Sequence, residues 1–153
     1  MTYDKSRFAE AMALWTEWND RINVVSRKDI DNLFEHHILH SLAIAEYKPF
    51  EPGQTVLDVG CGGGFPGIPL AMVMPDVQFT LCDSIGKKVK VAQAVADGLG
   101  LKNVRCVNAR AESLPDVYDW VVSRAVTSLD NFYPWVKDRF RRGILYLKGG
   151  DVN

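Results

Sequence analysis

"LDVGCGGGFPGIPL", residues 57–70, decides the fold of this 153-residue chain. Five glycines and two prolines fall within these fourteen residues, directly after the strand-forming run 55–59. Glycine has no Cβ and tolerates positive φ, so a loop of this kind lets a ligand approach the backbone. In parallel α/β sheets, ligands bind outside the carboxyl ends of the strands. The stretch therefore predicts a strand and a ligand-binding loop of such a sheet.

One alignment of these glycines gives a dinucleotide fingerprint. Residues 62–67 match G-x-G-x-x-G, and Asp83 follows about twenty residues later. However, the first glycine then lies well beyond the end of the strand. Phe65 and Pro66 also stand where the helix should open towards a pyrophosphate. These departures weigh against a dinucleotide.

The other alignment starts inside the strand, at Asp58, and continues with alternating Gly60, Gly62 and Gly64. An acid followed by such glycines resembles motif I of the S-adenosylmethionine-dependent methyltransferases. That cofactor has no phosphate, so no helix N-terminus needs to point at one. The glycines would let the backbone approach its methionine and ribose, and Asp58 would orient the loop amides or, indirectly, the cofactor amine.

The rest of the chain predicts a doubly wound, mainly parallel α/β sheet, Rossmann-like, with two N-terminal helices. Apolar residues at helical spacing predict helices over 4–22 and 30–46, the second capped by Ser26 or Asp29. Five short apolar strands then alternate with helices or long connections. The strands are expected at 55–59, 77–82, 103–107, 119–123 and 144–147, and the helices at 69–74, 84–99 and about 128–140.

We expect one methyltransferase domain over residues 1–153, with a helical extension at 1–48 and the cofactor-binding core at 54–153. A fifth strand followed by a loop is an awkward end for such a sheet, because its side would stay exposed. We therefore expect C-terminal strands to be missing from this sequence.

The composition of the chain restricts the kind of protein that it can be. The net charge is −1, but residues 1–75 carry 6 basic and 10 acidic groups, whereas residues 76–153 carry 12 basic and 9 acidic groups. The basic half is as compatible with a phosphate backbone as with a solvated surface. The sequence shows no signal peptide and no apolar run of membrane length, so we expect a cytoplasmic protein without a membrane partner. Separately, we expect a monomer. The three widely spaced cysteines predict small buried side chains rather than a zinc site.

Acidic residues follow two further strands. Asp83 ends the second strand, where an acid accepts hydrogen bonds from ribose hydroxyls in either cofactor class. Its alternative role is to cap the helix over 84–99. Ala111 and Glu112 follow the third strand, where such folds line the adenine pocket. An exposed loop acid is the alternative for Glu112.

All three histidines, His36, His37 and His40, lie on one predicted helix. The i,i+4 pair lacks a convincing acidic partner, so we expect no metal site. His37 falls on the apolar face and is expected to be packed or to line a pocket. Trp15 and Trp18 have helical spacing, which favours core packing over stacking on bases.

Several stretches together resemble one family, RsmG, also called glucose-inhibited division protein B. Their order and spacing carry the resemblance: "LDVGCGGGFPGIPLA", "LCDSIGKKVKV", "GLGLKNV", "RAES", "VVSRAV" and "LKGG", with "WNDRINVVS" and "HHILHSL" before them. The family consists of bacterial methyltransferases that use S-adenosyl-L-methionine and methylate N7 of a guanosine in 16S ribosomal RNA. The resemblance implies 16S ribosomal RNA or the small ribosomal subunit as the partner.

The resemblance also implies residue roles. Gly60 and Phe65 match cofactor-loop positions, Ala111 and Glu112 match an adenine-side pair, and Arg124 matches a cofactor-site or active-site arginine. His36 and His40 depart from the family, many members of which have arginine and aspartate there. No role is carried over to those two positions.

The implied chemistry needs few catalytic groups. Guanine N7 has a lone pair and no proton, so positioning rather than a general base would supply most of the rate. Arg124 would hold an RNA phosphate or the guanine O6, or would form a structural ion pair with Asp119. The alternatives are a methyltransferase for a small molecule or protein, and a nucleotide-dependent oxidoreductase or nucleoside-binding module.

Overall fold

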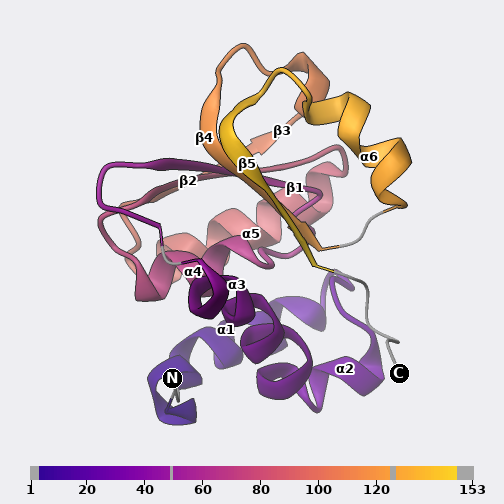
Figure 1. Ribbon diagram of the computed structural model, residues 1–153. Helices are drawn as coiled ribbons and strands as arrows, with labels where there is room; N and C mark the ends of the chain where they lie inside the picture. The colour runs from indigo at the N-terminus through magenta and orange to yellow at the C-terminus, as the bar shows by residue number, and fades with distance from the viewer. Residues whose placement is uncertain (1–3, 49, 125–126, 148–153) are drawn as a thin grey trace.

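The computed structural model describes residues 4–48, 50–124 and 127–147. A five-stranded, all-parallel sheet in the order β3-β2-β1-β4-β5 forms its centre (Figure 1). The strands are β1 (Thr55–Val59), β2 (Gln78–Asp83), β3 (Val104–Asn108), β4 (Tyr118–Arg124) and β5 (Phe140–Leu147). The strand order reverses between β1 and β4, which makes their carboxyl ends the switch point of a doubly wound sheet. The predicted fold class is confirmed.

Helices cover both faces of the sheet (Figure 1). α4 (Gly67–Val73) and α5 (Gly86–Gly98) pack on one face, together with the N-terminal helices, and α6 (Leu129–Val136) packs on the other. The alternation along β1 explains this division, because Val56 belongs to the first hydrophobic cluster and Leu57 to the second. No helix in these described ranges is long and apolar enough to cross a membrane.

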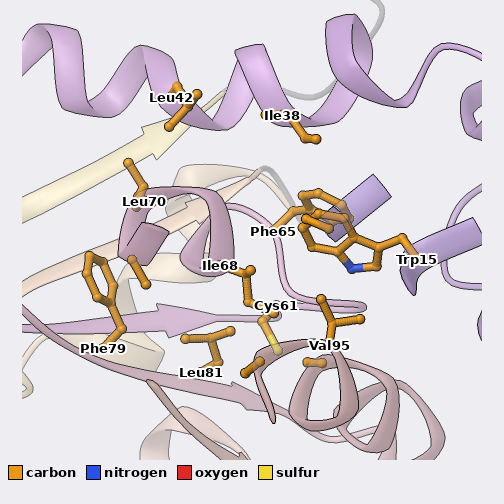
Figure 2. Close-up of a cluster of buried hydrophobic side chains, with 14 of the residues drawn as sticks. Trp15, Ile38, Leu42, Cys61, Phe65, Ile68, Leu70, Phe79, Leu81 and Val95 are labelled. Atoms are coloured by element: carbon orange, nitrogen blue, oxygen red, sulfur yellow. The ribbon is translucent and has the colours of Figure 1, made fainter. Parts of the chain in front are cut away.

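The N-terminal helices share a hydrophobic core with the sheet (Figure 2). Trp15 and Ile38 are fully buried in the same cluster as Phe79 and Leu81 of β2. Figure 2 shows the ring of Phe65, from the glycine loop, lying against that of Trp15 beneath the helix that carries Ile38 and Leu42. The front helices therefore contribute side chains to the interior of the α/β core.

The helix predicted over 30–46 is present as a continuous helical segment from Phe34 to Tyr47, but its first part is π-helical and it begins later than predicted. Ser26 caps only the short α2 (Arg27–Ile30), and a turn separates it from the π-helical η2 (Phe34–Leu39), which continues into α3 (His40–Tyr47). Asp29 does not cap a helix. A π turn widens the helix by one residue, which shifts the face that a 3.6-residue period predicts. Likewise, the helix over 4–22 divides into η1 (Lys5–Phe8) and α1 (Ala9–Asn19).

The boundary between the last helix and the last strand also differs from the prediction. α6 ends at Val136, and β5 already begins at Phe140, which pairs with Tyr118 of β4. The first half of β5 carries Arg141 and Arg142, which are exposed at the sheet edge. Exposed charges mask the apolar pattern of a strand, so the sequence hides this part of β5. The ends of "SRAV" (125–126) and "LKGG" (148–150) lie outside the described residues.

Candidate functional site

A cavity of about 310 Å³ lies over the carboxyl ends of β1, β2 and β3. Five of the predicted site residues line it: Gly60, Gly62, Asp83, Ala111 and Glu112. The other lining residues are Val59, Cys82, Ser84, Ile85, Lys88, Ala109, Arg110 and Trp135. The cavity is at the lower end of the size range of small-molecule sites, and it lies where the topology predicts a ligand.

The glycine loop brings its backbone to this cavity. Gly60 and Gly62 have φ of +71° and +56°, and Gly64 has φ of +121°, a region that L-residues rarely adopt. The amides of Gly60 and Cys61 both donate to the carbonyl oxygen of Cys82, at 2.9 and 3.1 Å, which folds the loop over the end of β2. A Cβ on Gly64 would meet Ile68 at 2.5 Å. The positive φ therefore favours glycine at all three positions, and at Gly64 an added Cβ would also displace the side chain of Ile68.

Asp58 lies fully buried at the end of β1, beneath the loop. Its Oδ2 accepts a hydrogen bond from the amide of Gly67 at 2.8 Å, as expected for an acid that orients loop amides. Its Oδ1 is buried and accepts no hydrogen bond from the described residues. Burial raises the pKa of Asp58 well above its usual range, and the Gly67 bond and the charge of Arg124 oppose this shift. Asp58 does not line the cavity, and one of its oxygens receives no hydrogen bond from the described residues.

Asp83 joins two segments at the rim of the cavity. Its Oδ2 accepts from the amide of Gly62 at 2.9 Å, and its Oδ1 accepts from the amide of Ile85 at 2.8 Å. α5 begins at Gly86 with Ile85 at the N-cap, so the alternative role of Asp83 as the helix cap is wrong. A carboxylate has about four acceptor positions, so both oxygens can still accept hydrogen bonds from a ligand.

The short helix η3 (Ala111–Ser113) forms the opposite wall. Arg139 holds it in place, because its Nε donates to the carbonyl oxygen of Ala111 at 3.1 Å and its Nη2 donates to that of Glu112 at 2.5 Å. Ala111 is buried, and Glu112 is exposed. The Glu112 side chain is therefore accessible at the cavity, on a backbone that Arg139 fixes.

Phe65 lies beside the cavity but does not line it. Its side chain is 2% exposed, and its ring stacks on Trp15 with centroids 4.4 Å apart (Figure 2). Nε1 of Trp15 donates to the carbonyl oxygen of Gly63 at 2.8 Å, so the tryptophan fixes two positions of the loop. The core role predicted for Trp15 is confirmed, and Trp18 packs partly buried against the same cluster.

Arg124 ends β4, next to β1, and also lies outside the lining of the cavity. Its Nη1 donates a hydrogen bond to Nδ1 of His37 at 2.7 Å, and its guanidinium lies 5.1 Å from the centroid of Phe65. The predicted alternative, an ion pair with Asp119, is wrong. Asp119 lies at the other end of β4, near Arg141 and Arg142, at 3.7 and 3.9 Å.

His37 connects Arg124 to the front helices. Its side chain is 8% exposed and tilts against Phe65, with centroids 5.1 Å apart, so the expected packed position is confirmed. Burial and the charge of Arg124 lower the pKa of His37 to about 4, although Asp29 opposes this shift. Asp29 also contacts Nδ1 of His36 at 3.0 Å. Among the residues that the structure describes, no three His, Cys, Asp or Glu side chains gather as a metal site requires.

Several lining residues were not predicted from the sequence. Trp135 reaches the cavity from α6, one residue after Pro134, and Ile85 and Arg110 come from the segments that follow β2 and β3. The rule that ligands bind at strand ends identifies Ile85 and Arg110 as candidates once the strands are placed. Trp135 depends on how α6 packs, which no local pattern encodes. Cys61 and Cys82 are buried as predicted, and Cys106 is half-buried.

Sequence comparison identifies closely similar proteins. A family model described as rRNA small subunit methyltransferase G (GidB) matches residues 4–152. The Ribosomal RNA small subunit methyltransferase G of Cytophaga hutchinsonii is 54% identical, over 96% of this chain and 75% of its own length. The protein of that name from Porphyromonas gingivalis is 52% identical, over 97% of this chain and 71% of its own length.

Structure comparison shows the fold alone. A SAM-dependent methyltransferase from Aquifex aeolicus superposes with a TM-score of 0.57 and 23% identity, covering 77% of this chain and 68% of that protein. The ribosomal protein L11 methylase of Lactobacillus delbrueckii subsp. bulgaricus has a TM-score of 0.58 at 17% identity, covering 70% of this chain and 56% of that protein. Both share the Rossmann-like arrangement of strands and helices described above.

Proposed function

The chain belongs to the rRNA small subunit methyltransferase G family, and from this we propose that it transfers a methyl group from S-adenosyl-L-methionine to N7 of a guanosine in 16S ribosomal RNA. Methylation of small-subunit ribosomal RNA with this cofactor follows from family membership. The choice of guanine N7, and the residue roles below, are our proposals.

The residues of the cavity fit the proposed cofactor. Asp83 and Glu112 offer carboxylate oxygens to ribose hydroxyls and to the adenosine end, with Ala111 as an apolar wall. The loop of residues 60–64 lets the methionine portion of the cofactor approach the backbone. Asp58, near the carboxyl end of β1, has one buried oxygen that receives no hydrogen bond from the described residues. S-adenosylmethionine supplies an electrophilic methyl group on sulfur. Asp58 holds the loop through Gly67, and Phe65 supports it from behind.

The chemistry proposed for N7 asks for orientation rather than proton transfer. N7 would accept the methyl group through its lone pair while the methyl–sulfur bond breaks and leaves its electron pair on sulfur, and no proton would leave the base. A site that holds both reactants in this geometry supplies most of the acceleration. Arg124, at the end of β4, offers N–H donors to a phosphate or to O6 of the guanine. No general base is needed in this scheme.

The observation that carries the proposal is the combination of the Asp58 and glycine-loop geometry with the family match over residues 4–152. The test is methyl transfer from labelled S-adenosylmethionine to small ribosomal subunits from cells that lack the modification. Mass spectrometry of the digested RNA should find 7-methylguanosine. A methylated base other than 7-methylguanosine would refute the N7 assignment and leave the methyltransferase activity intact.

Calorimetry tests the cofactor independently of the RNA. We expect the protein to bind S-adenosylhomocysteine and not NAD, because the loop register leaves Phe65 and Pro66 where a pyrophosphate-binding helix would open. Binding of NAD alone would refute the cofactor assignment.

We also propose that the protein is a cytoplasmic monomer that meets its RNA either free or in the small subunit. The basic residues that follow residue 75 support contact with a phosphate backbone, and among them Lys88 lies at the rim of the cavity. Transfer rates to free 16S RNA and to intact subunits, measured side by side, would identify the substrate form. Light scattering at working concentration would test the monomer.

A further inference from the structure

A chain of three polar side chains joins the front helices to the end of β4. Nη1 of Arg124 lies 2.7 Å from Nδ1 of His37, and Nε2 of His37 lies 3.3 Å from Oδ2 of Asp29. We propose that His37, which has the Asp29 carboxylate beside its Nε2, is a positioning residue that presents Arg124 to the acceptor nucleotide of the RNA. This inference rests on the proposed function.

The chemistry of the three groups fixes the protonation of the imidazole. Arginine is donor-only, so Nδ1 of His37 must accept and the proton of the neutral ring must lie on Nε2. Nε2 lies 3.3 Å from Oδ2 of Asp29, but the two groups are not aligned for a hydrogen bond. A carboxylate next to one ring nitrogen favours the tautomer that the other nitrogen needs. Asp29 therefore supports the acceptor state of His37.

The surroundings of Arg124 restrict it to one orientation. The guanidinium lies over the ring of Phe65, and His37 packs on the same ring, so a single aromatic side chain backs both groups. Within the described part of the chain, Arg124 donates a side-chain hydrogen bond only to His37. An arginine carries five N–H donors in a fixed fork, so most of this fork makes no hydrogen bond to the described residues.

The strand order places Arg124 on the acceptor side of the site. The cavity extends over β3, β2 and β1, and Arg124 ends β4, which is the next strand in the sheet. A cofactor with its adenosine near Glu112 would direct its methionine end towards β1 and β4. Arg124 would then lie beside the methyl group rather than beside the adenine. A cationic fork in that place fits a guanine or a phosphate of the RNA.

Two substitutions of His37 separate positioning from packing. His37→Asn keeps an oxygen near the position of Nδ1 but loses most of the ring. His37→Phe keeps the ring and loses the acceptor. If His37 positions Arg124, kcat/KM for the ribosomal subunit should fall by about tenfold or more in His37→Phe and by less in His37→Asn. If His37 only packs, the order should be reversed, because the phenyl ring preserves the contact with Phe65.

The same variants need two further measurements. Thermal unfolding should rank His37→Phe at or above His37→Asn, so that activity and stability change in opposite orders. Affinity for S-adenosylhomocysteine should stay within about twofold of the wild type in both, since His37 does not line the cavity. Equal loss of kcat/KM in the two variants, or a ranking that follows stability, would overturn the inference while the proposed function stands. A wild type that transfers no methyl group would overturn the function first.

The role of Asp29 can be tested with a variant at Asp29 and a control variant at Asp31. Asp29→Asn should lower kcat/KM for the subunit, and Asp31→Asn, which removes an exposed charge two residues away, should leave it unchanged.

¹⁵N spectra of the imidazole rings give a readout independent of activity. Only three histidines are present, and we expect His37 as the Nε2–H tautomer. An Nδ1–H tautomer would overturn the inference.

Discussion

Asp58 and Gly67 are joined by a 2.8 Å hydrogen bond from the backbone amide to Oδ2, which ties the last part of β1 to the first turn of α4. The other carboxylate oxygen is buried and accepts no hydrogen bond within the described ranges. A Cβ on Gly67 would approach Oδ2 to 2.8 Å, so the contact requires glycine. One acid therefore holds the loop, and its second oxygen receives no hydrogen bond from the described residues.

Asp58→Asn should separate stability from cofactor binding. The amide oxygen can still accept from Gly67, and the buried charge disappears, so we expect unchanged or raised thermal stability without ligand. The raised pKa of Asp58 leads to the same expectation. A buried acid with a raised pKa makes the protein more stable as pH falls through its folded pKa, because its charge is then neutralised. Affinity for S-adenosylhomocysteine should fall by about tenfold. A variant that binds the cofactor as well as the wild type would disprove the role of this carboxylate.

Gly60→Ala should weaken cofactor binding beyond its effect on stability. Gly100→Ala is the matched control, because Gly100 has nearly the same φ, +68° against +71°, and nothing lies within 4 Å of its added Cβ. Both variants should lose about 1–2 kcal/mol of unfolding free energy from backbone strain. Only Gly60→Ala should also lose affinity in calorimetry, since Gly60 lines the cavity. Equal affinity in the two variants would argue against close approach at Gly60.

Stability should fall as pH is lowered from about 6.5 towards 4, in part because of His37. Its folded pKa of about 4 is below the unfolded value of 6.5, so the unfolded chain takes up the proton first in this window. The contribution is on the order of 3 kcal/mol. Arg124, Asp29 and His36 are the charged or titratable groups that act on this ring. Urea unfolding of the wild type and His37→Asn should show a shallower pH slope in the variant, and parallel slopes would contradict this assignment.

Trp15→Phe tests the support behind the loop. The variant keeps an aromatic ring against Phe65 but removes the donor to the carbonyl oxygen of Gly63, which should destabilise the protein by about 1–2 kcal/mol. Trp18→Phe is the control, because Trp18 is only partly buried. Chemical denaturation should find a smaller change for the control than for Trp15→Phe. The reverse order would show that the Gly63 contact is unimportant.

The sheet was predictable from sequence because its strands are short apolar runs separated by turn residues. The errors arose where that signal is weak. Arg141 and Arg142 hide the start of β5, since an exposed edge permits charge in a strand. The π-helical segment Phe34–Leu39 is hidden because a 3.6-residue period cannot show an inserted residue.

The site was predictable where it is local and unpredictable where it depends on packing. Gly60, Gly62 and Asp83 follow from the ends of two strands. The sequence does not reveal that Phe65 turns away from the cavity, or that His37 accepts from Arg124 across 87 residues. Such contacts depend on how distant segments pack, and a single sequence does not contain that information.

The contacts of Trp15 have a consequence for modularity. Trp15 of α1 donates a hydrogen bond to the backbone of Gly63 and stacks on the ring of Phe65. The N-terminal helices and the glycine loop are therefore packed together. If the N-terminal helices were exchanged between two relatives, the residue at the position of Trp15 would have to pack against a glycine loop from the other protein. Chimeras made at the boundary near residue 50 should therefore fail unless the partners of Trp15 are exchanged with it. The N-terminal helices are thus part of the cofactor fold and not a separate appendage.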